Sequence, residues 1–159
     1  MHRARAVGIV KAGGLLVFRR CHQEIEYLML KKPKHKLHWS PPKGHVDAGE
    51  TNYEAAIRET FEEAALREEH LSIYKDTSWT LRYQTKGNRT KEVVYWLAQL
   101  RDWNTPIKLS NEHDGYKWVV ISDALEMSDR AKWPEMRRML LGAEEHLRSN
   151  MADGSTTST

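Results

Sequence analysis

The segment from Gly44 to Leu66 constrains this chain most, because it crowds acidic side chains onto one short helix. It reads GHVDAGETNYEAAIRETFEEAAL and carries Glu59, Glu62 and Glu63. On a helix these positions are i, i+3 and i+4, so the three carboxylates share one face. Like charges at such spacings oppose helix formation by roughly 0.2–0.5 kcal/mol per pair. The arrangement therefore favours a bound cation, and hard oxygen ligands with room for water suit Mg²⁺. A solvated acidic helix is the alternative.

The complete spacing decides between these two interpretations. It consists of Gly44, five residues, Glu50, seven residues, Arg58-Glu59, two residues and Glu62-Glu63. This pattern resembles the Nudix box, and the chain is identified as a member of the Nudix hydrolase family. The resemblance implies an α/β Nudix fold, a mixed β-sheet sandwiched between helices, with Mg²⁺ as cofactor and Mn²⁺ able to replace it.

Two positions depart from the family pattern, and neither removes a carboxylate. Thr60 stands where a large aliphatic residue is usual, and Ala65 stands where a glycine is usual near the helix end. A glycine would take the left-handed turn there at no steric cost. Ala65 is therefore expected either to cost roughly 1 kcal/mol or to move the helix end.

Composition limits the class of protein. A chain of 159 residues fits one domain, and 25 Lys and Arg against 22 Asp and Glu give a net charge of +3, which does not argue for a stable nucleic-acid partner. The single cysteine, Cys21, excludes an intramolecular disulfide and suits a reducing compartment, so we expect a cytoplasmic protein. No apolar run approaches 18 residues, so no membrane span is expected. Nothing demands assembly, and we expect a monomer.

The chain is expected to divide into an N-terminal extension (1–9), a catalytic domain (10–148) and a disordered tail (149–159). Arg3, Arg5 and Lys11 precede the first acidic residue, Glu24. This basic N-terminal segment is similar to a mitochondrial presequence. A short basic tail before a first strand is the favoured interpretation, because Leu15–Phe18 has the apolar character of core. The tail is rich in Ser and Thr and has no apolar periodicity.

Apolar patterning predicts the elements between these ends. Lys11–Arg20 and Glu26–Leu30 are expected to be strands, and residues 31–43 are expected to be a loop because they contain three prolines. The acidic helix should start near Thr51, with Thr51 or Asn52 as its cap, and bury the stripe Tyr53, Ala56, Ile57, Thr60 and Ala64.

The second half of the chain continues this mixed pattern. Trp79–Thr85 and Val93–Leu100 are expected to form a hairpin around the turn residues Gly87-Asn88. Tyr116–Ile121 is a further strand, and an amphipathic helix follows from Pro134. Strands and helices mixed in this way predict an α/β layered domain.

Three further segments narrow the substrate class. They are His38-Trp39-Ser40-Pro41-Pro42-Lys43-Gly44-His45, Lys91-Glu92-Val93-Val94-Tyr95-Trp96-Leu97-Ala98 and Leu109-Ser110-Asn111-Glu112-His113. Together they resemble the animal asymmetrical diadenosine tetraphosphate hydrolases, from about Val10 to Leu147. The resemblance implies hydrolysis of a small-molecule dinucleoside polyphosphate to ATP and AMP, with water attacking a phosphorus bonded to one adenosine.

Basic residues support a polyphosphate substrate independently. The loop before the box carries Lys31, Lys32, Lys34, His35, Lys36, His38 and Lys43, and the hairpin tip adds Lys86, Arg89 and Lys91. For most of them a solvated surface charge is the better interpretation. Lys43 is the exception because it adjoins the acidic helix, and His38, Lys91 and Arg89 are the other candidates for phosphate binding. Adenine needs an aromatic platform, and Tyr83 and Tyr116 match the family positions, with a buried core tyrosine as the alternative.

The resemblance also implies roles for the acidic residues. Glu59, Glu62 and Glu63, with the Gly44 carbonyl, would bind Mg²⁺. Arg58 would orient the glutamates, and Glu50 would support the box by a salt bridge. Glu59 or Glu112, the extra carboxylate outside the box, would act as general base. Two alternatives remain: a Nudix hydrolase of RNA 5′ ends or diphosphoinositol phosphates, and a non-catalytic nucleotide-binding module.

Overall fold

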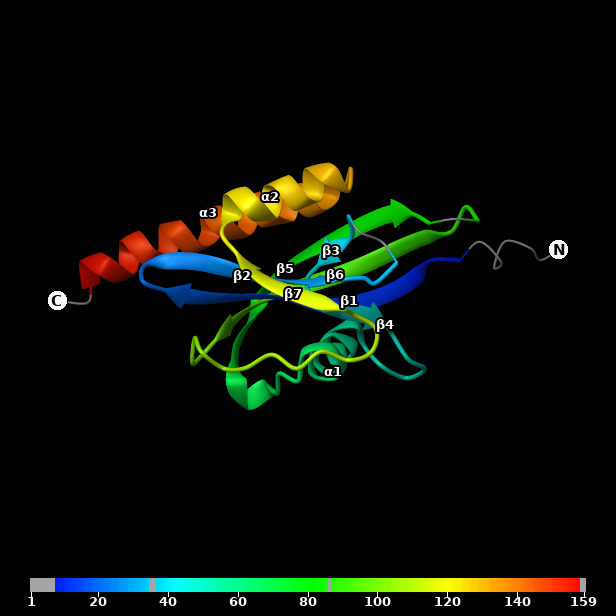
Figure 1. The fold of residues 1–159 in the computed structure, drawn as a ribbon, viewed down its shortest axis with the longest axis horizontal. Coiled ribbons are helices and arrows are strands. Elements are labelled where there is room, and N and C mark those ends of the chain that lie inside the picture. The colour runs from blue at the N-terminus through cyan, green and yellow to red at the C-terminus, as the bar shows by residue number, and fades with distance from the viewer. Residues whose placement is uncertain (1–7, 35–36, 86, 158–159) are drawn as a thin grey trace.

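The computed structural model describes residues 8–34, 37–85 and 87–157. In these residues a mixed sheet carries helices on both faces (Figure 1), which confirms the predicted fold class. In chain order the elements are β1 (Val10–Cys21), β2 (Glu24–Lys31), β3 (Trp39–Ser40), β4 (Lys43–His45), α1 (Asn52–Ala64), a 3-10 turn (Glu68–His70), β5 (Leu71–Gln84), β6 (Thr90–Leu100), β7 (Gly115–Val119), α2 (Ile121–Arg130) and α3 (Pro134–Thr157).

The pairing of β1 positions the acidic segment. The described strands form one seven-stranded sheet with the path β3-β2-β1-β6-β5. β1 runs parallel to β6, and its other partners are antiparallel. Ala12–Gly14 of β1 pair with β4, whereas Phe18–Cys21 pair with β2. This change of partner brings Gly44, the first residue of the acidic motif, beside α1.

Alternate residues of β1 build two separate cores. Leu16 and Phe18 pack towards α3, where they join Met136 in one apolar cluster. Leu15 and Val17 belong to the second cluster, which includes the alanines of α1. Side chains alternate between faces in a strand, so one continuous apolar run covers both sides of the sheet. Figure 1 shows α1 on one side and α2 with α3 on the other.

Helix α1 begins and ends where the sequence predicts. Thr51 is the N-cap: its hydroxyl accepts a hydrogen bond from the Glu54 amide at 3.1 Å, and its own amide donates to the Glu54 carboxylate at 2.9 Å. Ala65 follows the last turn with φ 60° and ψ 32°, in the left-handed region. Of the two predicted outcomes, the chain therefore accepts the strain of about 1 kcal/mol and keeps the helix end in place.

The predicted buried stripe of α1 needs one correction. Ala56, Thr60 and Ala64 are buried, but Glu63, assigned to the polar face, is only 5% exposed. The reason is that β4 lies across this side of the helix, and the Lys43 amide donates to Glu63 Oε1 at 3.1 Å. The same face therefore contributes to packing and carries a functional carboxylate.

Several elements differ from the sequence predictions, and the loop predicted over residues 31–43 contains the short strand β3 and the start of β4. The strand predicted over Tyr116–Ile121 ends at Val119, and the unpredicted helix α2 begins at Ile121. β5 starts at Leu71, well before Trp79, because an irregularity between Tyr74 and Ser78 lets the strand change register and continue. Because of this irregularity, the first part of β5 does not show the continuous alternation of apolar and polar residues that predicts a strand.

The two ends of the chain bear on the predicted domain boundaries. Residues 1–7 of the predicted extension lie outside the described residues, and β1 starts at Val10. Helix α3 continues past the predicted boundary at Ser149 to Thr157, because no proline in this stretch interrupts its backbone hydrogen bonds. In the described part of the chain, none of the helices has the length and apolarity needed to cross a membrane.

Candidate active site

A cavity of about 260 Å³ opens where β4 meets α1 and the loop before β7. It joins residues from separate segments of the chain, including six that the sequence predicts as site residues. Those six are Lys43, Gly44, Glu59, Glu63, Lys91 and Glu112. The other lining residues are Lys32, Ser40, His45, Asp47 and His113.

Gly44 and Glu59 form the closest approach in this cavity. A Cβ atom added to Gly44 would lie 2.0 Å from the Glu59 carboxyl carbon. Any larger residue would displace the carboxylate, so the glycine leaves Glu59 its position at the cavity. Glu63 lies one turn further along α1 and accepts the Lys43 amide hydrogen. The backbone of β4 thus holds Glu63 by a hydrogen bond and leaves room at Gly44 for the Glu59 carboxylate.

Arg58 organises the acidic residues behind the cavity. Its guanidinium donates to Glu59 Oε2 at 2.9 Å and to Glu62 Oε1 at 3.2 Å. It also donates to the His45 carbonyl at 2.9 Å and pairs with both oxygens of Glu50. These contacts place Glu50, Glu59 and Glu62 around one arginine, whereas Glu63 is held by the Lys43 amide.

Electrostatics in the cavity favour an added positive charge. Burial raises the pKa of Glu63 to about 8, and the charges of Glu59 and Glu112 also raise it. Burial raises the pKa of Glu59 too, with Glu62 and Glu112 adding to the shift. Glu112 is exposed, yet its charge acts on both buried carboxylates. Three mutually repelling carboxylates in one cavity are stabilised by a cation.

The residues fit a divalent cation in their donor chemistry. Carboxylates and a backbone carbonyl are the hard oxygen ligands that Mg²⁺ prefers, and the glycine at position 44 leaves its backbone open to Glu59. Among the described residues, no group of three or more His, Cys, Asp or Glu side chains already has the geometry of a metal site. Instead, Arg58 binds Glu59 and Glu62, and the Lys43 amide binds Glu63. The ligand set Glu59, Glu62, Glu63 and Gly44 therefore remains a prediction.

Two lysines bring positive charge to the same cavity. Burial lowers the pKa of Lys43, and the nearby charges of Lys91 and Lys32 lower it further. Burial also lowers the pKa of Lys91. An anionic ligand would stabilise the charged form of both lysines, because each is desolvated and lies near the positive charge of the other.

The remaining predicted cations lie outside the cavity lining. Arg89 is exposed at the hairpin tip just before β6, although its charge acts on His45. His35, Lys36 and Lys86 fall outside the described residues.

His38 and Tyr83 meet at an aromatic cluster on the other face of the sheet. The His38 ring stacks on Trp133 with centroids 5.3 Å apart, and Tyr83 contacts Trp133 edge-to-face at 5.3 Å. Tyr83 lies opposite Lys91 in the β5–β6 ladder, so the cluster adjoins the basic side of the cavity. Tyr83 is partly buried, so its exposure does not decide between an adenine platform and a core tyrosine.

Tyr116 is 43% exposed on β7 and does not line the cavity. Its cross-strand partner is Leu30, which belongs to the core on the α1 face. Cross-strand partners share a face, so Tyr116 lies on the side of the sheet that carries the glutamates. The exposure removes the alternative of a buried core tyrosine.

Sequence reasoning missed several residues of the site. Trp133 was not singled out, although it directly precedes Pro134, the predicted start of the last helix. His113 lies in the segment quoted for Glu112, is buried, and lines the cavity. Lys32 was grouped with surface lysines. Only the folded chain shows that these residues face the cavity or the aromatic cluster.

Comparison with known proteins agrees with this geometry. A NUDIX domain model matches residues 1–141. A curated bis(5′-nucleosyl)-tetraphosphatase [asymmetrical] from Caenorhabditis elegans is 45% identical over 132 residues, which cover 82% of this chain and 93% of the relative. The protein of that name from Mus musculus is 37% identical over 149 residues, covering 90% of this chain and 99% of the relative.

A solved structure supports the same relationship. A C. elegans Ap4A hydrolase in a binary complex superposes with a TM-score of 0.81 at 43% identity. The match covers 88% of this chain and 98% of that chain. The similarity therefore extends over the whole catalytic domain rather than the acidic motif alone.

Proposed function

The chain belongs to the NUDIX family, and from this premise we propose that it is an asymmetrical bis(5′-nucleosyl)-tetraphosphatase. It hydrolyses diadenosine tetraphosphate to ATP and AMP. The family supplies the reaction class, and the relatives named for this activity match over most of the chain.

One observation carries the proposal: a single cavity joins the carboxylates Glu59, Glu63 and Glu112 to the lysines Lys32, Lys43 and Lys91. A site for inorganic cations alone would not need lysines in its lining, and a site for anions alone would not need carboxylates there. A polyphosphate that carries its own divalent cation satisfies both sets of charges.

Glu59, Glu62, Glu63 and the Gly44 carbonyl would hold the divalent ion, for which we propose Mg²⁺, with Mn²⁺ able to replace it. When bound, the ion would polarise the phosphate and offset charge that develops on the departing ATP. The contacts of Arg58 with Glu59 and Glu62 keep these carboxylates at the cavity.

Glu59 or Glu112 takes the proton from the attacking water at a carboxylate oxygen. Both act electrostatically on Glu63, so both lie close to the reacting phosphate in this proposal. Arg58 donates to Glu59 and makes that oxygen a weaker base, whereas Glu112 is solvent-exposed. The pH–rate profiles of Glu59→Gln and Glu112→Gln distinguish the two candidates. Only substitution of the general base should remove the acidic limb of the profile.

The substrate extends from the cavity in two directions. Lys43 and Lys91 bind its phosphates, with His38 and Arg89 at the margin. Tyr83, which contacts Trp133, and Tyr116 are the aromatic platforms available to one adenine of the substrate. We further propose a monomer that acts in the cytoplasm, since the single cysteine suits a reducing compartment.

The test is a product assay with diadenosine tetraphosphate and Mg²⁺, resolved by chromatography. The proposal predicts equal amounts of ATP and AMP and no ADP. Two molecules of ADP per substrate would overturn the asymmetrical assignment. No turnover in the presence of either metal, with intact nucleotide binding, would favour a binding module.

A further inference from the structure

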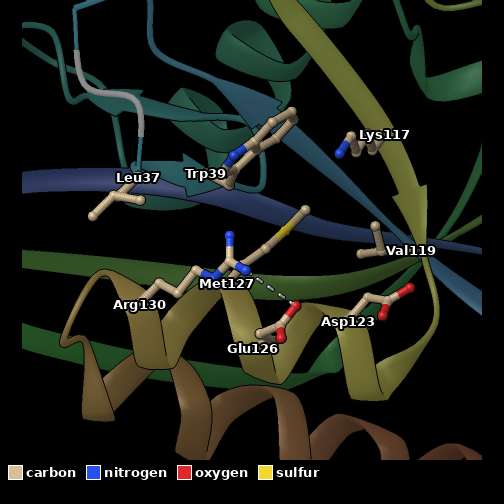
Figure 2. A pocket seen from close by; sticks show the side chains of 8 residues that line it. All are labelled: Leu37, Trp39, Lys117, Val119, Asp123, Glu126, Met127 and Arg130. Carbon is tan, nitrogen blue, oxygen red and sulfur yellow. Dashed lines mark ion pairs between the residues drawn. The ribbon is translucent and has the colours of Figure 1, made fainter.

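A second cavity of about 310 Å³ lies between β3, β7 and α2, on the face opposite α1. Figure 2 shows it from close by: Trp39 lies across from Met127, with Leu37 at one end and Val119 at the other. Its volume is at the lower end of the range of roughly 300–1,000 Å³ for small-molecule sites. We call it the Trp39 pocket. It has room for a ligand of about nucleoside size.

Four charged side chains surround this apolar floor. They are Lys117, Asp123, Glu126 and Arg130. Glu126 and Arg130 come only to 4.0 Å of each other, and both side chains are 65% exposed, so this ion pair is weak. Lys117 lies 5.1 Å above the Trp39 ring. Both signs of charge are thus available around an indole and a thioether.

This combination matches the three parts of a nucleotide. A planar base can lie on the indole, because stacking on an aromatic ring is favourable whatever the base. Carboxylates such as Asp123 and Glu126 accept hydrogen bonds from ribose hydroxyls or an exocyclic amine. Lys117 and Arg130 can bind a phosphate. An apolar ligand would leave the charged groups unused, and an inorganic ion would leave the aromatic floor unused.

The position of the pocket also favours a nucleotide. Strand β3 contributes Trp39 to this pocket and Ser40 to the active-site cavity. A Cβ on Gly115 would lie 4.0 Å from the Trp39 ring, and Glu112 and His113 of the active-site cavity precede it closely. The two cavities have no lining residue in common, but neighbouring residues of β3 line them, and the segment from Glu112 to Lys117 that connects them spans at most about 17–18 Å when extended.

We propose that the Trp39 pocket binds a nucleoside monophosphate moiety, either the distal end of the dinucleoside substrate or free AMP. The first source rests on the proposed function, and the second does not. In both cases the pocket recognises the same chemistry: a base on Trp39, a ribose at the α2 carboxylates and a phosphate at Lys117 or Arg130.

The first test is a calorimetric titration with AMP, without metal so that no turnover occurs. The test variant is Asp123→Asn with Glu126→Gln, both exposed on α2, and the matched control is Glu145→Gln on α3. AMP affinity should fall roughly 5- to 30-fold in the test variant and stay unchanged in the control. Trp39→Leu, which keeps an apolar floor without the ring, should have the same effect.

Lys91→Met separates the two cavities, because it removes a phosphate contact in the active site only. The pocket component of AMP binding should survive this change. If Lys91→Met abolishes all AMP binding while the α2 variant binds like the wild type, AMP occupies only the active site and the proposal is overturned.

Steady-state kinetics identify the source of the ligand. If the pocket holds the distal end of the substrate, the α2 variant raises KM for diadenosine tetraphosphate about 5-fold or more but leaves KM for adenosine 5′-tetraphosphate unchanged. If it holds free AMP, both KM values stay unchanged and product inhibition by AMP weakens. If the α2 variant changes neither the AMP affinity nor the kinetics, the proposal that the Trp39 pocket binds a nucleotide is overturned. Lack of turnover by the wild type would overturn the proposed function alone, since the AMP titration would still test the pocket.

Discussion

Arg58 donates to both oxygens of the Glu50 carboxylate, from Nε to Oε2 at 2.7 Å and from Nη2 to Oε1 at 3.0 Å. A paired contact of this kind fixes the plane of the guanidinium. The remaining nitrogen, Nη1, then faces Glu59 and Glu62. Glu50 thus influences the position of carboxylates that it does not touch.

Glu50→Gln should destabilise the protein in a pH-dependent way. Hydrogen bonds from Arg58, and a further one from the Asp47 amide, lower the pKa of Glu50 to about 2 from its ordinary 4.5. A carboxyl with a lowered pKa stabilises the fold above its unfolded pKa, and this contribution is lost as the pH falls from about 4.5 to about 2. Thermal melts should show a lower Tm for the variant at neutral pH and a shrinking difference below about pH 4.5. A difference that stays constant would contradict the account.

Glu63→Gln should lower turnover by several orders of magnitude and raise thermal stability in the absence of metal. Gln keeps the acceptor oxygen for the Lys43 amide, so the local fold is preserved. It also removes a carboxyl whose pKa burial raises to about 8, so that the folded chain must hold it protonated at neutral pH at a cost in stability. Glu69→Gln is the control, because Glu69 is exposed and lies outside the cavity lining. Equal loss of kcat in both variants would refute a special role for Glu63.

Tyr116→Ala should raise KM about 5- to 100-fold with a smaller effect on kcat, because a stacking platform is worth roughly 1–3 kcal/mol. The exposed position predicts an unchanged Tm. Trp103→Ala is the matched control, since Trp103 is an exposed aromatic residue outside both cavities. A KM that stays at the wild-type value would show that adenine binds elsewhere.

Thr60→Val should stabilise the protein. Thr60 is buried in α1, and its hydroxyl has no hydrogen-bond partner in the part of the chain that the structure describes. Such a hydroxyl costs about 1–3 kcal/mol, and valine has nearly the same shape. Tm should rise by about 2–4 °C per kcal/mol in a chain of this size. Thr51→Val, which removes the N-cap, should lower Tm instead. A decrease for both variants would mean that the Thr60 hydroxyl has a partner.

The acidic helix could be predicted closely because its signals are local. Thr51 and Glu54 form a capping box three residues apart, and the glutamates follow helical spacing. Helix α2 could not be predicted in this way. It starts after Val120, which provides no side-chain cap, and only that residue separates it from β7, so the apolar run from Trp118 to Ile121 conceals its start. The burial of Glu63 escaped the same reasoning, because it depends on β4 crossing the helix.

The residues of the site also divide into those that local sequence patterns predict and those that only tertiary packing brings together. Residues within a motif, such as Lys43 and Glu59, were identified from spacing, and the structure brings them into one cavity. The contact of Tyr83 with Trp133 joins positions 50 residues apart, so no local pattern reveals it. The Trp39 pocket is a further case, since its walls come from β3, β7 and α2. Tertiary packing, rather than sequence spacing, creates both.

The most direct test of the central claim is hydrolysis of diadenosine tetraphosphate in ¹⁸O-labelled water, with the products separated and weighed by mass spectrometry. Attack of water on the phosphorus bonded to one adenosine predicts ATP and AMP in equal amounts, with one ¹⁸O atom in AMP and none in ATP. Label in ATP, or the formation of ADP, would contradict the account.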